Sequence, residues 1–176
     1  MRLFIAINLN DKTKGALLDL RDELRSRAQS GSFTLPENLH MTLAFLGECS
    51  AKQYAAAKTA MDEVNFESFE LIIERVGRFG GRQGEATWWA GARESNALFD
   101  LQRVLAGKLE DAGFVTESRR FSPHITIGRR VITDSAPWPI EPFGETVRKI
   151  DLMKSERING KLTYTAIYEK NRGACG

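Results

Sequence analysis

Apolar residues follow two periods along the chain, and the two kinds of segment are interleaved. In some segments every second residue is apolar, or a short run is wholly apolar, which is typical of strands. In others the apolar residues recur every third or fourth position, which is typical of amphipathic helices. The first pattern predicts strands over residues 2–8, 39–46, 66–79, 86–90, 123–129, 145–155 and 162–168. The second predicts helices over residues 11–29, 51–64 and 95–112. This mixed order of helices and strands predicts an α+β fold.

Residues that favour helix ends and tight turns support these boundaries. Ser50 and Gln53 have the spacing of a capping box at the start of a helix. Gly113 is placed to end the third helix. The Asn159-Gly160 pair predicts a hairpin between the last two strands.

Other segments are predicted to connect the regular elements. Gly, Ser and Pro residues between Gly31 and Asn38 predict a loop, and the Gly80–Gly84 segment predicts a turn between two strands. Pro137, Pro139 and Pro142 predict a surface connection after the strand that ends near residue 129.

Two copies of one short pattern stand out among the predicted strands. The only two histidines, His40 and His124, are each followed two residues later by a threonine, Thr42 or Thr126, with apolar residues between and after. Because alternate residues of a strand share a face, each strand offers an imidazole and a hydroxyl opposite its apolar side. The repeat suggests an internal duplication. We therefore expect two lobes whose antiparallel sheets face a central cleft, with the helices outside.

Composition limits the possible classes of protein. The 176 residues suit one domain, residues 1–176, made of two closely packed lobes. A net charge of +2 excludes a strongly cationic nucleic-acid coat protein but permits a local anion site. The first apolar run is too short for a signal peptide, and no segment approaches the length of a membrane-spanning helix. Cys49 and Cys175 lack the spacing of metal ligands and are expected to be free thiols in the cytoplasm.

The two histidines suit acid–base chemistry at phosphorus. Imidazole has an unperturbed pKa of about 6.5, so near neutrality one copy can be neutral and the other charged. The two threonines would donate hydroxyl hydrogen bonds to phosphate oxygens. Two alternatives remain open from the residues alone: unrelated structural histidines, and a metal site. A metal site has little support, because no third His or Cys with suitable spacing is available.

Two arginines follow the second His-x-Thr pattern. Strict alternation from His124 places Arg130 on the site face, whereas a bulge at Gly128 turns Arg129 inward instead. Either guanidinium would stabilise phosphate charge. The pattern does not choose between them, nor does it exclude that both are solvated.

These segments resemble a known family. The stretches His40–Gly47 and Ser122–Arg129 look like the paired H-x-T-x motifs of the 2H phosphoesterase superfamily. Within it the chain resembles the RNA 2′,3′-cyclic phosphodiesterases, also called the 2′-5′ RNA ligase or LigT-like family. Arg2–Ile7, Pro36–His40 and Phe121–His124 also look like that family, so the likeness spans nearly the whole chain.

The resemblance implies both a fold and a reaction. It implies a bilobal fold with pseudo-two-fold symmetry and a site without metal or cofactor. It implies hydrolysis of a terminal 2′,3′-cyclic phosphate on RNA to a 2′-phosphate. By motif position, His40 is the proton donor and His124 the proton acceptor, while Thr42 and Thr126 bind the phosphate. The arginine after the second motif falls on Arg129, which favours the bulge.

The sequence also suggests binding partners and leaves alternative functions open. We expect a monomer that acts on RNA with a 2′,3′-cyclic phosphate terminus or on a small nucleotide, without a membrane. Candidates for stacking on a base are Phe4, Phe45, Trp88, Trp89, Phe121 and Tyr164, although the core is the better expectation for each, Phe45 above all. Candidates for contact with the RNA backbone are Arg78, Arg82, Arg119 and Arg120. The competing functions are a 2H enzyme with another substrate, such as 2′-5′ linked RNA or a small cyclic nucleotide, and a non-catalytic RNA-end binding module.

Overall fold

The structure, a computed structural model, describes residues 1–81 and 84–174. Within these residues the helices are α1 (Asp11–Arg27), α2 (Ala51–Asp62), α3 (Asn96–Asp111) and a short 3₁₀ helix, η1 (Pro36–Asn38). The strands are β1 (Arg2–Asn8), β2 (Ser30–Phe33), β3 (His40–Glu48), β4 (Phe69–Gly80), β5 (Ala86–Ala92), β6 (His124–Ile132), β7 (Trp138–Val147), β8 (Lys149–Ile158) and β9 (Lys161–Asn171).

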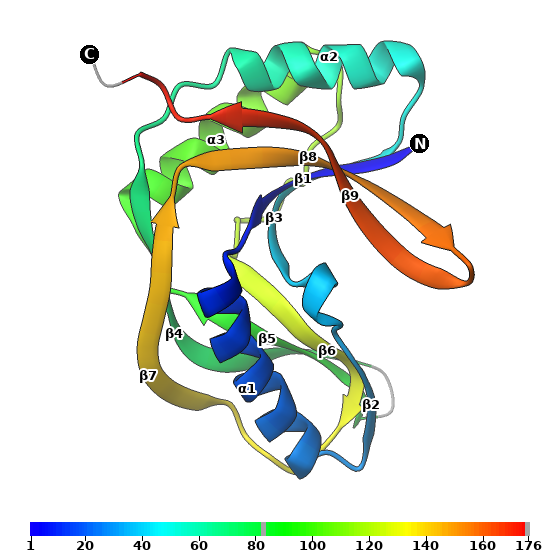
Figure 1. Ribbon diagram of the computed structural model, residues 1–176, viewed down its shortest axis with the longest axis vertical. Helices are drawn as coiled ribbons and strands as arrows, with labels where there is room; N and C mark the ends of the chain where they lie inside the picture. Colours follow the sequence, from blue (N-terminus) through cyan, green and yellow to red (C-terminus); the bar gives the residue numbers. More distant parts are fainter. Residues whose placement is uncertain (82–83, 175–176) are drawn as a thin grey trace.

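The strands form two antiparallel sheets, one above the other in Figure 1. One sheet has the order β3-β1-β8-β9 and the other the order β2-β6-β5-β4-β7. Helix α1 packs against the five-stranded sheet, whereas α2 and α3 pack together beside the four-stranded sheet. The predicted α+β fold with two antiparallel sheets is confirmed.

The two sheets do not correspond to the two halves of the sequence. Strand β1 belongs to the four-stranded sheet, but α1 and β2, which follow it, belong to the other layer. The chain returns for β3, leaves again for β4 and β5, and comes back for the β8–β9 hairpin at the end. Each layer therefore contains strands from both halves of the chain, whereas both termini lie at the four-stranded layer (Figure 1).

One continuous apolar core joins the layers. The fully buried side chains include Leu17 and Leu24 of α1, Ile5 of β1, Met41 of β3 and Trp88 of β5. Burying a side chain of this size contributes on the order of 1.5–3 kcal/mol. The core-facing residues of β1 and β3 thus fix those strands against the helices. On the opposite face of β1, Phe4 and Ala6 form a small second cluster with Met153. No helix in the described part of the chain is long and apolar enough to cross a membrane.

The predicted helix ends and hairpin are confirmed. The Ser50 side chain accepts from the Gln53 backbone N–H, while the Gln53 side chain accepts from the Ser50 N–H, which completes the capping box. Gly113 has a φ of +91° directly after α3, a conformation that favours glycine. Asn159 and Gly160 have φ values of +51° and +77°, as the tight β8–β9 turn requires.

Three predictions about the connections were wrong. The segment from residue 31, expected to be a loop, contains β2, which pairs with β6 although its sequence has no apolar alternation. The proline-containing connection is strand β7, with Pro139 and Pro142 inside it. An edge strand tolerates proline because one side of its backbone has no partner strand. Among the described strands, β7 pairs only with β4. The single strand expected over residues 145–155 is divided between β7 and β8.

Candidate active site

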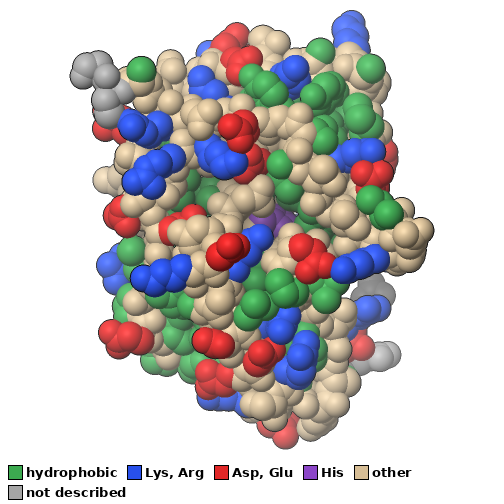
Figure 2. Space-filling view, in the orientation of Figure 1, with side chains coloured by type: hydrophobic (Ala, Val, Ile, Leu, Met, Phe, Trp, Pro, Cys, Tyr) green, Lys and Arg blue, Asp and Glu red, His purple; other side chains and the backbone are tan. Residues whose placement is uncertain are grey.

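The two motif strands meet at the junction of the two sheets. Both β3 and β6 begin at their histidines, and the two strands contact each other across the layers. His40, Thr42, His124, Thr126 and Arg129 all line one cavity of about 240 Å³. Figure 2 shows histidine surface recessed near the centre of one face, between the two halves of the molecule. The structure therefore brings together all five side chains that the sequence singled out.

Each histidine is held by a backbone carbonyl two residues before it. Nδ1 of His40 lies 2.8 Å from the Asn38 carbonyl oxygen, and Nδ1 of His124 lies 2.7 Å from the Ser122 carbonyl oxygen. A carbonyl oxygen only accepts hydrogen bonds, so Nδ1 must be the protonated nitrogen of each neutral ring. Nε2 is then the atom that can gain or lose a proton. The sequence motif did not predict this pair of equivalent contacts.

Aromatic rings pack against both imidazoles. Phe4 and Tyr164 lie 4.9 and 5.1 Å from the His40 ring, measured between ring centroids. Phe79 lies 5.0 Å from the His124 ring and is perpendicular to it. Such contacts fix the ring planes and displace water from the imidazoles.

Trp89 also lies on the His124 side, 6.2 Å from that ring, whereas Trp88 is fully buried in the core. A side chain at Gly77 or Gly91 would approach the Trp89 indole to 2.3 or 2.7 Å, so both glycines make room for it. Of the two tryptophans, therefore, only Trp89 is placed beside the site.

Burial is the main electrostatic influence on both histidines. It lowers the pKa of His40 below its usual value of 6.5, and the positive charges of Arg129, His124 and Lys14 lower it further. Burial likewise lowers the pKa of His124, with a further contribution from Arg129. The carbonyl contacts at Nδ1 oppose both shifts without reversing them. With both pKa values below 6.5, the protein alone favours the neutral form of both rings at neutral pH.

The threonines occupy matching positions but differ in their contacts. The Thr42 hydroxyl lies 3.0 Å from Nε2 of His40. The Thr126 hydroxyl makes no hydrogen bond to another described residue, although the Thr126 carbonyl accepts one from the Thr34 hydroxyl at 2.9 Å. Both hydroxyls line the cavity and can donate to an anion there.

A bulge in β6 determines which of the two candidate arginines faces the cavity. Trp88 pairs with Gly128 and Trp89 with Thr126, so Ile127 is an extra residue in β6. After this bulge Arg129 lines the cavity with the histidines. Arg130 takes a φ of +50° and lies outside that lining. The geometry is that of the bulged alternative, which the alternation of apolar residues alone did not select.

A similar irregularity in β3 corrects the expectation for Phe45. Its side chain was expected in the core, on the face of Met41, but it is 47% exposed. The β1–β3 pairing shifts register between Ile5 and Ala6. That shift places Phe45 opposite Phe4 and turns it toward the cleft, on the same side as Thr42.

The remaining candidates have mixed outcomes. Arg119 and Arg120 border the cleft, but they form ion pairs with Glu117 and Glu94 at 3.9 and 3.3 Å. Arg78 is exposed beside the Trp88 ring.

The other predictions concern Phe121 and the cysteines. Phe121 borders the cleft and packs against Phe99. Cys49 is a buried free thiol, with burial raising its pKa. Arg82 and Cys175 lie outside the described residues.

Two further spaces adjoin the cavity that both histidines line. One, of about 730 Å³, is lined by His40, Thr42 and Arg129 but not by His124. The other, of about 440 Å³, is lined by Thr42 and His124 but not by His40. The cleft thus has a His40 side and a His124 side, and Thr42 and Phe45 line both.

The chain is similar to known phosphoesterases. The model of the family described as LigT like Phosphoesterase matches residues 7–89. The RNA 2′,3′-cyclic phosphodiesterase of Archaeoglobus fulgidus is 33% identical over 129 residues, which cover 73% of this chain and 72% of that protein. The enzyme of the same name from Escherichia coli K12 is 26% identical over 167 residues, covering 94% and 93% of the two chains.

Solved structures agree with these relatives. The crystal structure of E. coli LigT in apo form superposes with a TM-score of 0.83 at 25% identity, covering 97% of this chain and 96% of that one. The structure of LigT complexed with 3′-AMP gives the same TM-score. The fold and the paired motifs are thus those of a 2H phosphoesterase. More narrowly, the chain belongs to the LigT-like phosphoesterase family, as its motifs suggested.

Proposed function

We propose that this enzyme hydrolyses the 2′,3′-cyclic phosphate at the end of RNA to a 2′-phosphate, with His40 as acid and His124 as base and without a metal ion. The relatives named RNA 2′,3′-cyclic phosphodiesterase support the substrate. The observation that carries the mechanism is the shared arrangement of the histidines. Both imidazoles line one cavity, and each has Nδ1 fixed by a carbonyl so that Nε2 is the exchanging atom.

The reaction requires one proton to leave and one to arrive. A water molecule attacks phosphorus while neutral His124 takes its proton at Nε2. The bond between phosphorus and the 3′ oxygen breaks, and protonated His40 donates from Nε2 to that oxygen. Each proton transfer contributes on the order of 10²–10⁴ in rate.

The remaining side chains act on the phosphate charge. Thr42 and Thr126 donate hydroxyl hydrogen bonds to the non-bridging oxygens, and the Arg129 guanidinium stabilises their negative charge. This charge also raises the pKa of His40 when substrate binds, since an anion favours the protonated ring. The substrate itself thus helps to charge the acid.

Donor chemistry supports a mechanism without metal. Among residues 1–81 and 84–174, no three His, Cys, Asp or Glu side chains lie close enough together to hold a metal ion. The positive groups near the phosphate site are Arg129, Lys14 and the histidines themselves. In this proposal they provide the electrostatic stabilisation.

The test is incubation of a short RNA ending in a 2′,3′-cyclic phosphate with the protein in excess EDTA. Phosphorus NMR should show the cyclic phosphate replaced by a 2′-phosphate. Turnover that disappears in EDTA and returns with one divalent ion would refute the metal-free mechanism. A 3′-phosphate product would mean that the 2′ oxygen leaves, and the donor assignment would be wrong. Binding without turnover would instead indicate a non-catalytic RNA-end module.

We also propose that residues 1–176 act as one domain and as a monomer in the cytoplasm. All five site residues come from this chain, and both lobes contribute to the cavity. Sedimentation of the active protein at assay concentration tests this part, and a dimer under those conditions would contradict it.

A further inference from the structure

The two sides of the cleft have different roles in the proposed reaction. The 3′ oxygen leaves next to His40, so the terminal ribose and the RNA attached to it must lie on the His40 side. The attacking water approaches from the His124 side. The space on the His40 side is therefore the one that RNA can enter. We call it the upstream groove, formed by Arg2, Phe4, Phe45, Lys154, Arg157 and Tyr164 together with the catalytic cavity.

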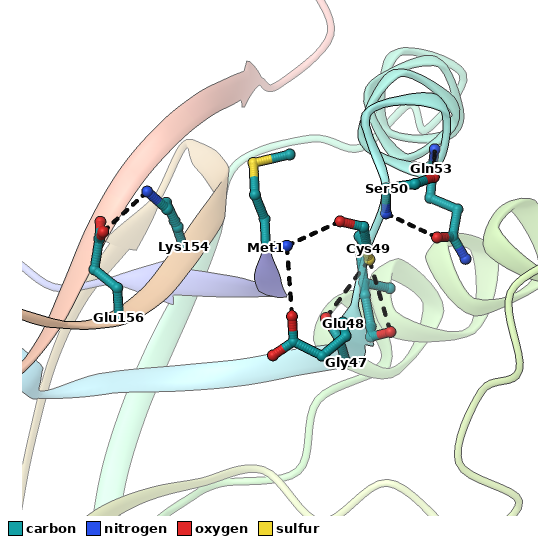
Figure 3. A network of polar contacts seen from close by, with 9 residues as sticks. Met1, Gly47, Glu48, Cys49, Ser50, Gln53, Lys154 and Glu156 are labelled. Carbon is teal, nitrogen blue, oxygen red and sulfur yellow. Dashed lines mark hydrogen bonds and ion pairs between the residues drawn. The ribbon is translucent and has the colours of Figure 1, made fainter.

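The charges in the upstream groove suit an anion. Its two carboxylates, Glu48 and Glu156, are already neutralised. Glu156 pairs with Lys154 at 2.9 Å, and Glu48 pairs with the N-terminal ammonium group of Met1 at 3.4 Å. Both contacts are drawn in Figure 3.

Three guanidinium groups in the upstream groove have no such partner. Among the described residues, Arg2, Arg129 and Arg157 form no ion pair with a carboxylate. Arg157 donates to the carbonyl oxygen of Gly160, which holds it on the β8–β9 hairpin. The groove thus has an unbalanced positive charge that extends well beyond the single phosphate site at Arg129.

An exposed aromatic ring lies beside one of these arginines. The bulge in β3 turns Phe45 into the groove, and the Arg2 guanidinium lies 5.1 Å from its ring centroid. An exposed aromatic ring beside arginine is the usual surface on which a single-stranded base stacks. Without the register shift in β3, the Phe45 ring would lie in the core and could not contact a base.

The order of these groups along β1 follows the path of a chain. Phe4 contacts His40, and Arg2 lies on the same face two residues further, about 7 Å away by strand geometry. Arg157 lies on the neighbouring strand, two residues beyond the partner of Arg2 in the β1–β8 pairing. Moving outward from the catalytic cavity, the groove therefore presents an aromatic ring, then Arg2 with Phe45, then Arg157.

We propose that the upstream groove binds the nucleotides that precede the terminal cyclic phosphate, with Arg2 and Arg157 on phosphodiester groups and Phe45 against a base. This inference rests on the proposed function, because the role of His40 as acid decides which side holds the RNA. It makes the enzyme selective for RNA oligomers over cyclic mononucleotides.

The experiment compares two substrates: a nucleoside 2′,3′-cyclic phosphate and a trinucleotide with the same terminal nucleotide. In the wild type, kcat/KM should be at least tenfold higher for the trinucleotide. Arg2→Gln and Arg157→Gln should each remove most of this preference through KM while leaving turnover of the mononucleotide unchanged. Each should also reduce the slope of log kcat/KM against log salt by up to about 1 for the trinucleotide alone. Phe45→Leu should lower the trinucleotide value by about tenfold.

Matched variants distinguish the effect of the groove arginines from the effect of the protein's overall charge. Arg103→Gln removes an exposed arginine of α3 outside the cleft and should leave kcat/KM for both substrates unchanged. Arg119→Gln and Arg120→Gln alter the His124 side and should keep the oligomer preference. Melting temperatures close to the wild type exclude misfolding, and Arg2→Lys should retain part of the preference.

The outcomes distinguish this inference from the proposed function. Equal turnover of both substrates by the wild type, or a preference that survives Arg2→Gln and Arg157→Gln, overturns the upstream groove and leaves the hydrolysis intact. A preference lost only in the Arg119 and Arg120 variants places the RNA on the opposite side and overturns it as well. Failure to hydrolyse either substrate refutes the proposed function. In that case, the anisotropy of a labelled trinucleotide 2′-phosphate tests the groove, and unchanged binding in Arg2→Gln and Arg157→Gln overturns it.

Discussion

His40 and His124 occupy equivalent places in two similar motifs, yet their surroundings differ. Both begin a strand, and both donate from Nδ1 to the carbonyl two residues before. His40 also contacts the Thr42 hydroxyl and has Phe4 and Tyr164 against its ring. Within residues 1–81 and 84–174, His124 has no such hydroxyl contact, and it lies beside Phe79 and Trp89.

The comparison teaches that the protein alone does not charge one histidine and neutralise the other. Burial lowers the pKa of both, with Arg129 acting on both in the same direction. In the proposed reaction, the acid and the base are therefore distinguished by the bound substrate, which places the leaving oxygen near one ring and the water near the other.

Removing either imidazole should have the largest effect on activity. His40→Ala and His124→Ala should each lower kcat by about 10²–10⁴, because each deletes one proton transfer. The double variant should be little worse than either single one, since the pair acts as a unit. Single-turnover kinetics with cyclic-phosphate RNA measure this.

A phosphodiester with a p-nitrophenyl leaving group sharpens the assignment. It needs no acid, so it should restore turnover in His40→Ala but not in His124→Ala. The reverse pattern would exchange the two roles.

Arg129 acts on both rings, and its neighbour provides the control. Arg129→Gln should reduce kcat/KM by roughly 10- to 100-fold, the equivalent of 1.5–3 kcal/mol for a hydrogen bond to a charged group. It should also raise the pKa of both histidines, because a nearby positive charge is lost. Arg130→Gln, outside the cavity lining, should do neither. Equal losses in the two variants would contradict the assignment of Arg129.

The threonines test whether the two motifs bind phosphate equally. Thr42→Val and Thr126→Val should each cost about 1–3 kcal/mol of transition-state stabilisation, seen in kcat/KM. Only Thr42→Val should also alter the titration of a histidine, since only Thr42 contacts an imidazole. Nitrogen-15 NMR of the imidazoles would reveal this, and a matching change in Thr126→Val would mean that the sites are more alike than their contacts.

The pH dependence probes both rings together. Because the pKa of each free histidine lies below 6.5, kcat/KM should be bell-shaped with its maximum on the acidic side of 6.5. The profile of kcat, which reports the complex, should be displaced upward because the phosphate charge favours protonation. A kcat/KM maximum above pH 7 would contradict the effect of burial.

The smallest expected effect is on stability. Both histidines have a lower pKa folded than unfolded, so their contribution is fully present above about pH 6.5. It is lost as the pH falls through the folded values, because the unfolded chain takes up the protons first. Urea unfolding between pH 7 and 5 should show a decline that is smaller in His40→Asn. An unchanged decline would assign it to other groups.

Much of the site could be predicted because strand geometry is regular. The period of two residues placed His40 and Thr42 on one face, and likewise His124 and Thr126. The repeated motif then predicted that the two faces meet. The shared face within each strand needs only local backbone geometry, which the apolar pattern determines. That the two faces meet followed from the repeat and from the family resemblance.

Within the site, the open alternative and the error arose where strands depart from regularity. The bulge at Ile127 decided between Arg129 and Arg130, and the register shift in β3 turned Phe45 out of the core. Such insertions depend on the partner strand, so alternation within one strand cannot reveal them. Arg2 and Phe79 were missed as cleft residues for a related reason, because they join the cleft only through pairing between distant segments.

The crossing of the chain between the two layers has a consequence for how the enzyme is made. The sheet that carries His40 has β1 at its interior, and β1 lacks one neighbour until β8 has been synthesised. On the ribosome, the N-terminal portion therefore waits with an unpaired strand edge while more than 100 residues are added. Such long-range pairing slows folding and exposes the nascent chain to aggregation. Catalytic competence should thus arrive late, with the final hairpin.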